Sequence, residues 1–295
     1  MRIQKKNIRQ NLELLLFSLP AIVFVFIFVH LPLWNGISYS LYDWDGVSNH
    51  PVFVGLRNFV DLFHDSFFRG AFGYTLIYTF TNIIFINIIA VFLAELLSSK
   101  DLKVGGIMRT VFFAPNVISL VVTAMIWMFI FSTATAGLAK TTGWNFINID
   151  WFGNTFHARL VLFIVTAWVT SGYLMIIYVA GINAIDQSLL EAASIDGCSR
   201  LNLFFRIKLP LLMPSVVICV FWITLYSLKS FDLPYVLTGG GPSSTTETLA
   251  MNMYSTAYQY SRYGYACAKG IVLFLIIFVI TMLELLVLKK KEVEH

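Results

Sequence analysis

Apolar residues occur along this chain in six long blocks that are separated by shorter polar segments. The blocks cover residues 14–33, 74–97, 111–131, 160–182, 211–231 and 271–288. Each is close to the roughly 20 residues that an α-helix needs to cross a bilayer. Because a lipid-exposed spanning segment must satisfy its own backbone, each block is predicted to be a transmembrane helix. The predicted fold class is an all-α, polytopic membrane protein with six transmembrane helices.

Composition supports this class. Of the 295 residues, 58% are hydrophobic and only 12% are charged, whereas about 25% are charged in soluble domains. The net charge of +4 comes from short clusters at the ends of the apolar blocks. No basic stripe with interleaved exposed aromatics appears, so nucleic-acid binding is excluded. Membrane lipid is the expected surrounding.

The positions of the cations predict the orientation of the helices. By the positive-inside rule, the cationic clusters at both ends of the chain, between the second and third blocks, and between the fourth and fifth blocks would face the cytoplasm. These clusters contain Arg2, Lys5, Lys6, Arg9, Lys100, Lys103, Arg109, Arg200, Arg206, Lys208 and Lys289 to Lys291. Both termini are therefore predicted to be cytoplasmic, with residues 1–10 as a cytoplasmic N-terminus and 11–295 as a single transmembrane domain. The first block could be read as a signal peptide, but it is too long and lacks an A-x-A site, which favours an uncleaved span.

The sequence offers no set of residues for catalysis or metal binding. Its three cysteines (Cys198, Cys219 and Cys267) form no CxxC pair, and its five histidines form no HExxH pair. The "GGGP" segment lacks the GK[ST] of a phosphate-binding loop. The chain is therefore predicted not to be an enzyme and to hold no cofactor or metal of its own.

One cytoplasmic connection, residues 186–210, contains "EAASIDGCSRLNLFFRIKLP". A short helix is predicted to begin either with a Ser188–Glu191 capping box or with Asp186 as N-cap. Gly197 is predicted to end this helix in a left-handed turn. A second amphipathic piece follows, and Pro210 is predicted to move Leu209 out of the α region and to begin the next span. On physical grounds alone, this connection could equally be an interfacial linker.

Polar residues within the spans suggest where a solute could bind. Lys229 lies three residues before Asp232, and the two could form an interfacial ion pair or Lys229 could line a cavity together with Ser227 and Ser230. In the fourth span, "TAWVTSGYLM" offers aromatic and hydroxyl groups that suit sugar rings, or that serve ordinary helix packing: Trp168, Thr170, Ser171 and Tyr173.

Three further residues have a structural interpretation. Asn82 and Asn87 are predicted to form hydrogen bonds between helices, and Pro115 is predicted to kink the third span.

The spacing EAA-x3-G-x9-I-x-LP, from Glu191 to Pro210, resembles the EAA loop of binding-protein-dependent ABC importers. Three other segments are similar to the sugar branch of these permeases, which includes the maltose, multiple-sugar and glycerol-3-phosphate importers: "PVFVGLRNF", "MRTVFFAPNVISLVVTAMIW" and "FDLPYVLTGGGP". The likeness extends over most of the chain and implies the transmembrane fold of type I importers. Residues 186–210 are called the EAA loop below.

The resemblance implies that the EAA loop docks on a separate ATPase dimer, which binds ATP and Mg. The residues it assigns to this coupling are Glu191, Ala192, Ala193, Asp196, Gly197, Ile207, Leu209 and Pro210. Cys198 stands where alanine is common. Further implied partners are a second, homologous permease, an extracytoplasmic solute-binding protein and an oligosaccharide or other sugar.

The resemblance also implies that Thr170, Tyr173, Ser227 and Ser230 lie near sugar-contacting positions. The asparagines common at the span-five site are absent, so the substrate is expected to differ from maltose. Two alternatives remain at this point. One is a self-contained, ion-coupled transporter, against which the lack of a duplicated inverted half counts. The other is an importer of the same type for glycerol-3-phosphate or another non-sugar solute.

Overall fold

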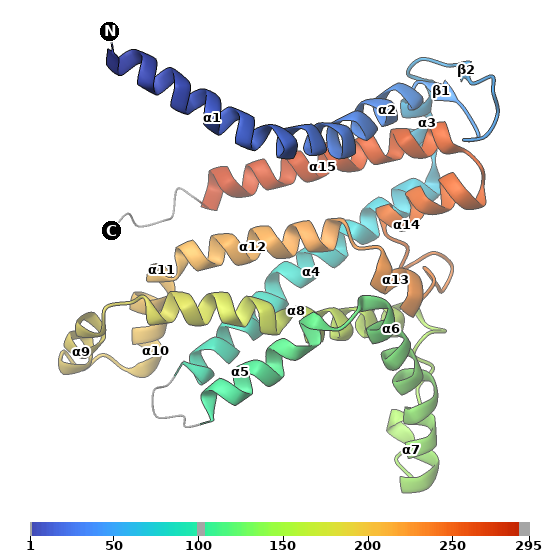
Figure 1. Ribbon diagram of the computed structural model, residues 1–295. Helices are drawn as coiled ribbons and strands as arrows, with labels where there is room; N and C mark the ends of the chain where they lie inside the picture. The colour runs from blue at the N-terminus through green and yellow to red at the C-terminus, as the bar shows by residue number, and fades with distance from the viewer. Residues whose placement is uncertain (1, 99–103, 289–295) are drawn as a thin grey trace. The chain divides into compact units, whose positions relative to one another are not determined.

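The structure, a computed structural model, describes residues 2–98 and 104–288. Helices dominate it, and the chain divides into two compact units, one formed by residues 1–64 and 253–272, the other by residues 65–252 and 273–295 (Figure 1). The predicted cationic positions Lys100, Lys103 and Lys289 to Lys291 lie outside the described residues. Within the described residues, five helices are long and apolar enough to span a membrane, or six when one bent pair is counted as a single span.

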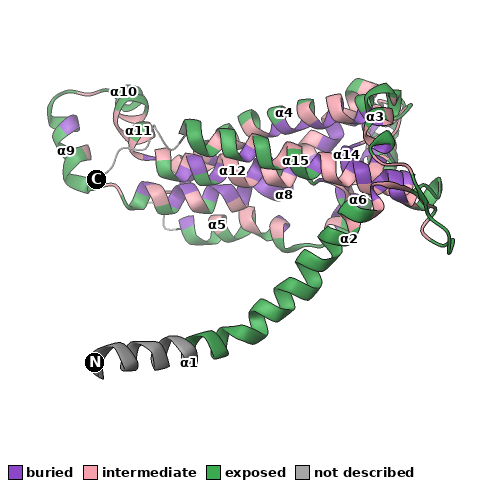
Figure 2. Ribbon diagram, turned by 90° about the horizontal axis from the view of Figure 1, so that it is seen from above, coloured by how far each residue is buried: buried purple, intermediate pink, exposed green. Residues whose placement is uncertain are grey.

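The first unit begins with a helix that runs through α1 (Arg2–Val25), a π-helical turn (Phe26–His30) and α2 (Leu31–Tyr39). From Leu14 to Tyr39 this helix has span length, and none of its most apolar window is buried by the rest of the chain. Its apolar side chains are therefore available to lipid. Figure 2 shows this exposure along the part of α1 whose side chains are described.

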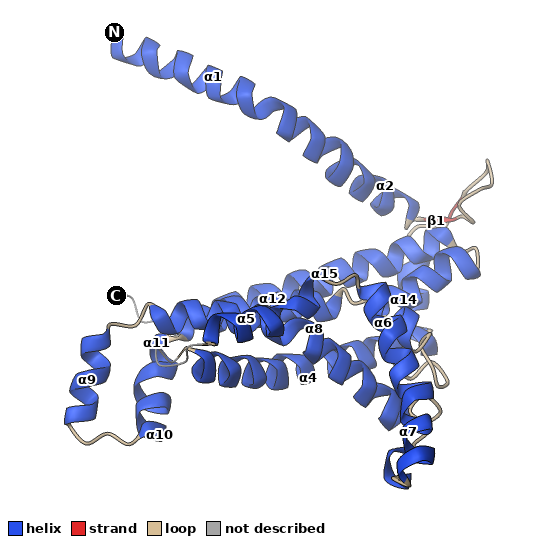
Figure 3. Ribbon diagram, turned by 60° about the horizontal axis from the view of Figure 1, so that its bottom comes forward, coloured by secondary structure: helices blue, strands red, loops and turns tan. Residues whose placement is uncertain are grey.

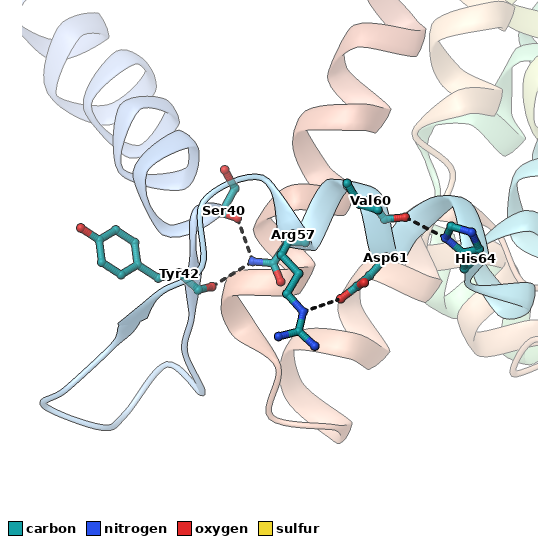
Figure 4. A network of polar contacts seen from close by, with 7 residues as sticks. Ser40, Tyr42, Arg57, Val60, Asp61 and His64 are labelled. Atoms are coloured by element: carbon teal, nitrogen blue, oxygen red, sulfur yellow. Dashed lines mark hydrogen bonds and ion pairs between the residues drawn. The ribbon is translucent and has the colours of Figure 1, made fainter.

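A small polar network follows α2. Strands β1 (Tyr42–Asp43) and β2 (Val52–Phe53) pair antiparallel, and α3 (Arg57–His64) comes next. The buried amide of Asn58 donates from Nδ2 to the carbonyl oxygens of Ser40 and Tyr42, at 2.8 and 3.0 Å (Figure 4). The Asn58 amide therefore provides hydrogen-bond donors for two backbone carbonyls that lie between α2 and α3. Tyr263, at the start of α15 (Tyr263–Leu288), packs against Trp44 in the same unit.

In the second unit, three long helices form the core: α4 (Ser66–Leu97), α8 (Thr155–Asn183) and α12 (Met213–Leu228). Figure 2 shows buried positions concentrated on these helices. α8 is the most enclosed of the span-length helices, with 61% of its apolar window buried. Its small residues allow this packing, because a Cβ at Gly172 would collide with the carbonyl oxygen of Phe112 on α5 (Gly105–Phe113).

Interhelical hydrogen bonds fasten the core, as predicted for the two asparagines. Asn82 on α4 donates from Nδ2 to Ser227 Oγ on α12 at 3.0 Å. Tyr178 on α8 donates to Asn87 Oδ1 on α4 at 2.7 Å.

The remaining elements lie at the two ends of this unit. Figures 1 and 3 place the short helices of the EAA loop at one end, and α6, α7 and α13 at the other. The loop helices are α9 (Gln187–Ile195), α10 (Arg200–Asn202) and α11 (Leu209–Leu211), with a π-helical segment at Leu203–Lys208; the other end has α6 (Leu120–Phe129), α7 (Thr135–Thr142), α13 (Asp232–Leu237) and α14 (Leu249–Tyr254), which continues into the first unit. A π-helical segment, Ile130–Ala134, and a short 3₁₀ helix, Asn145–Ile147, also belong to the second unit, and a π-helical segment, Ser255–Gln259, belongs to the first.

The third predicted span differs from the structure. Residues 111–131 are not one helix: α5 ends at Phe113, a 3₁₀ turn occupies Ala114–Val117, and Ile118 and Ser119 are extended. The helix of span length in this region is Leu120–Thr142. Pro115 begins a break rather than a kink, because the chain leaves helical geometry for two residues.

Candidate functional site

The first helix of the EAA loop begins at Asp186. This residue is the N-cap, with an extended backbone, and its side chain accepts a hydrogen bond from the Ser188 backbone N–H at 2.9 Å. These hydrogen bonds, from the backbone and side chain of Ser188, lower the pKa of the Asp186 carboxyl. The alternative capping box does not form, since Ser188 lies inside the helix.

Gly197 ends the helix as predicted. Its φ is +76°, and Asp196 is the C-cap. The Cys198 N–H donates to the Ala193 carbonyl at 3.0 Å and the Gly197 N–H to the Ser194 carbonyl at 3.2 Å. These two bonds form a Schellman motif, which favours glycine at the left-handed position. Apart from Gly197 and its two neighbours in the sequence, no heavy atom of the described residues lies within 4 Å of the position that a Cβ would occupy.

The loop divides its predicted coupling residues between two faces. Glu191, Ala192, Asp196 and Gly197 are exposed, whereas Ala193 is 9% exposed and packs toward the rest of the chain. Ile207 and Leu209 are half-buried, and Pro210 is exposed. A hollow of about 540 Å³ separates α9 from the second half of the loop, and its lining comprises Gln187, Leu190, Glu191, Ser194, Ile195, Leu203 and Lys208.

The prediction for Leu209 and Pro210 is wrong. Leu209 has φ −61° and ψ −43°, which is helical, and Pro210 lies within α11. The chain turns instead at Leu212, where Arg200–Leu211 and α12 meet at a bend of 71°. Pro214, near the start of α12, has the helix-initiating position that was expected for Pro210.

Two polar contacts connect this end of the unit to α4. Lys208 Nζ donates to Glu95 Oε1 and forms an ion pair with it. Arg109 on α5 donates from Nη2 and Nε to the Leu97 carbonyl, at 2.5 and 3.2 Å. That carbonyl is at the C-terminus of α4, where it has no partner within the helix. Both contacts therefore join the last turn of α4 to a neighbouring segment.

A cavity of about 320 Å³ opens beside α12 and α13 and is called the span-five cavity; its lining comprises Leu120, Trp222, Leu225, Tyr226, Lys229, Ser230, Phe231, Asp232 and Leu233. Lys229 and Ser230 were predicted here. Lys229 is exposed and is the C-cap of α12. Within residues 2–98 and 104–288, Lys229 makes no ion pair with Asp232, so the interfacial pair does not form.

Aromatic rings extend from this cavity toward α8. Tyr173 packs on Trp222 with ring centroids 4.6 Å apart, and Trp222 stacks on Tyr226 at 5.2 Å. Tyr173 was predicted as a path residue, whereas Trp222 and Tyr226 were missed. Their only sequence signal is two aromatics four residues apart, which lie on one helical face.

The other predicted path residues are engaged in packing. Thr170 is fully buried and donates to the Thr166 carbonyl at 2.7 Å. Ser227 is also fully buried, accepts from Asn82, and does not line the cavity. Ser171 is 7% exposed, and Trp168, which is 40% exposed, packs on Trp127. These positions favour the helix-packing alternative.

No three His, Cys, Asp or Glu side chains come together as a metal site in the part of the chain that the structure describes. The three cysteines are free. A multi-helix membrane unit that has a largely apolar cavity with a few polar side chains, and a capped loop helix at the opposite end, is consistent with a membrane transport component. Comparison with known proteins then gives the family.

Residues 86–292 match the family described as binding-protein-dependent transport system inner membrane components, and the chain belongs to it. The chain is 35% identical over 279 residues to the probable starch degradation products transport system permease protein AmyD of Thermoanaerobacterium thermosulfurigenes, covering 95% of this chain and 94% of that protein. It is 29% identical to the multiple sugar-binding transport system permease protein MsmF of Streptococcus mutans, with 94% and 95% covered.

The fold agrees with a solved structure. A chain of a bacterial ABC transporter involved in the import of the acidic polysaccharide alginate superposes with a TM-score of 0.84 at 22% identity, covering 98% of this chain and 99% of that one. The likeness shows the type I importer transmembrane fold. The chain is thus a multi-pass, inner-membrane permease of the sugar branch and not an enzyme, which decides against the self-contained ion-coupled transporter.

Proposed function

We propose that this chain forms half of the translocation path of an ATP-driven carbohydrate importer and that its EAA loop binds the ATPase. The observation that carries the proposal is the geometry of α9. Its exposed face presents Glu191 and Ala192, and the left-handed turn at Gly197 leaves open space beside the helix. Short side chains and absent Cβ atoms let a second protein approach the backbone closely.

The proposed complex has three further parts: a second, homologous permease; a cytoplasmic ATPase dimer that binds ATP and Mg; and an extracytoplasmic solute-binding protein. One permease chain provides few spans for an enclosed path, which supports a heterodimer. The cationic clusters support a topology in which residues 1–10, the EAA loop and the C-terminus are all cytoplasmic. The relatives that import sugars support a carbohydrate substrate.

The span-five cavity is the proposed substrate contact in this subunit. It combines aromatic faces with a hydroxyl at Ser230, which suits the alternating apolar and polar surfaces of a sugar. Its one cation, Lys229, is balanced by Asp232 in the same lining. A lining without net charge supports a neutral carbohydrate over glycerol-3-phosphate.

Protection of a native thiol tests the docking site. Cys198 directly follows Gly197 and is half-buried, while Cys219 is buried. In a Cys267→Ser variant reconstituted in lipid, a maleimide should label Cys198, and adding the ATPase subunit should suppress that labelling. The control is a Val47→Cys, Cys198→Ser, Cys267→Ser variant, because Val47 is 86% exposed in a loop predicted to face outward. Equal labelling of Cys198 with and without the ATPase would refute the proposal.

A further inference from the structure

An ion pair connects the EAA loop to a helix that is distant in the sequence. Lys208 lies in the π-helical segment Leu203–Lys208, and Glu95 lies in the last turns of α4. The residues are separated by 113 positions. Their side chains are 16% and 37% exposed, so the lysine is mostly shielded from solvent and the glutamate is partly exposed.

The environment of this pair differs from that of an ordinary surface pair. Arg57 and Asp61, one helical turn apart on α3, are separated by 3.9 Å with side chains 77% and 47% exposed. Such exposed pairs contribute little. Glu95 has a second oxygen, Oε2, which is buried and has no hydrogen-bond partner among the described residues. Loss of Lys208 would therefore leave neither oxygen of this carboxylate paired within the described residues, which is costly for the buried Oε2.

The Glu95–Lys208 pair lies where the EAA loop contacts α4 and close to where the chain continues into α12. Lys208 lines the hollow beside α9 together with Glu191, and it immediately precedes α11 and the 71° bend at Leu212. Displacement of the loop reaches α12 through that bend, which connects two separate helical axes. The same displacement reaches α4 directly through Glu95.

α4 carries this connection toward the span-five cavity. Asn82, which bonds to Ser227 on α12, precedes Glu95 on the same helix by a rise of roughly 20 Å. Ser227 lies two residues before the cavity residue Lys229. At the loop end, Glu95 therefore links α4 to Lys208 in the segment that precedes α12, and beside the cavity Asn82 links α4 to Ser227 on α12 itself.

We propose that Glu95 and Lys208 are positioning residues that make α4 and α12 move together when the EAA loop moves. Neither residue has to contact the ATPase or the solute. Without the pair, the loop would still dock, but its motion would reach the cavity through the bend at Leu212 alone. This inference rests on the proposed function, because it presupposes an ATPase bound at α9.

The test uses the assembled importer in liposomes with its binding protein. The variants are Glu95→Gln and Lys208→Met, the conservative Lys208→Arg, and the exchange Glu95→Lys with Lys208→Glu. Asp61→Asn breaks the exposed pair and is the matched control. Three quantities are measured for each: ATPase captured by the purified permease, thermal unfolding, and sugar taken up per ATP hydrolysed.

Glu95→Gln and Lys208→Met should capture the ATPase as the native chain does, yet transport less sugar per ATP. We expect a fall of about fivefold or more, the lower range of coupling between two sites. Lys208→Met should be worse than Glu95→Gln, because a glutamine oxygen still accepts from Lys208. Lys208→Arg and the exchange should recover most of the ratio, and Asp61→Asn should leave it unchanged.

Three results would overturn the proposal. One is a native ratio in both neutral variants. A second is that ATPase capture, thermal stability and uptake all fall together while the sugar taken up per ATP stays unchanged. That result would show that the pair only stabilises the structure. The third is an exchange variant that transports no better than Lys208→Met. If the native chain itself captured no ATPase, the proposed function would fail first, and that result is separate from these.

Discussion

Substitutions of Gly197 can distinguish two requirements of the EAA loop: a left-handed backbone at this residue, and free space beside it. The residue has a left-handed backbone at φ +76°, and it has open space where a Cβ would project. Ala, Asn and Arg at this position all carry the same Cβ. Asn tolerates the left-handed region best of the three, and only Arg adds bulk. The series Gly197→Asn, Gly197→Ala and Gly197→Arg therefore varies backbone cost and volume in turn.

The backbone cost can be estimated. A non-glycine residue in the left-handed region costs roughly 1–2 kcal/mol, and 1.4 kcal/mol corresponds to about a tenfold change in an equilibrium constant. If only the capped turn binds the ATPase, Gly197→Ala should weaken its capture by about five- to thirtyfold at most. Gly197→Asn should weaken it less. Arg has about the same backbone cost as Ala, and apart from the adjoining residues no described atom lies within 4 Å of the Cβ from which its side chain would extend.

Any loss beyond that of Ala must therefore come from another molecule. We expect Gly197→Arg to weaken capture by at least a further ~10-fold, since its side chain fills the space in which the partner would pack against the helix. The assay is titration of the ATPase onto purified permease in nanodiscs, with span insertion checked by proteolysis and uptake measured in parallel. Equal affinities for the Ala and Arg variants would refute a close approach at Gly197. Native affinity and transport in all three would make the loop a connector.

Three other perturbations test the core, the cavity and the loop cap. Gly172→Val should lower the thermal unfolding temperature of the permease in detergent, because its Cβ would collide with the Phe112 carbonyl and overpacking costs about 1–3 kcal/mol; an unchanged temperature would contradict the observed contact of α5 with α8. Ser230→Ala and Tyr173→Ala should each raise the KM for sugar uptake while leaving subunit assembly intact, since the serine lines the span-five cavity and the tyrosine supports its aromatic wall; normal uptake kinetics in both would move the substrate contacts to the partner permease. Asp186→Ala should speed hydrogen exchange at the first amides of α9, whereas Asp186→Ser, which can still accept from the backbone, should not; equal exchange in both would show that the cap is dispensable.

Much of the membrane architecture could be predicted because it follows from length and hydropathy alone. The lipid environment requires long apolar helices, and these are visible in a sequence. The EAA loop was likewise predictable in its helix and its turn, since Asp186 and Gly197 act through local backbone chemistry. The interhelical role of Asn82 followed from the cost of burying an amide without a partner.

Other features depend on packing that the sequence does not display. Both faces of a span are apolar, so nothing marks the break at Ala114–Val117 or the choice of Leu212 as the bend. Trp222 and Tyr226 look like any aromatics in a membrane helix until the adjoining cavity is seen. The Glu95–Lys208 pair joins segments 113 residues apart, and a single sequence holds no record of such proximity. Ser227 was misplaced because which way a serine points is set by tertiary packing.

The loop that carries "GGGP" is more rigid than its glycine content suggests. Its hydroxyls and carbonyls bond within the loop: Thr246 Oγ1 donates to the Gly241 carbonyl at 2.6 Å, and Thr238 and Thr246 share a bond at 2.9 Å. Arg159, from the start of α8, donates twice to the Thr245 carbonyl, at 3.1 and 3.0 Å. A glycine-rich loop ordinarily loses conformational entropy when a partner binds it. In this loop, folding has already imposed that loss. Any protein that docks on this loop meets a preformed surface, so more of its contact energy becomes affinity.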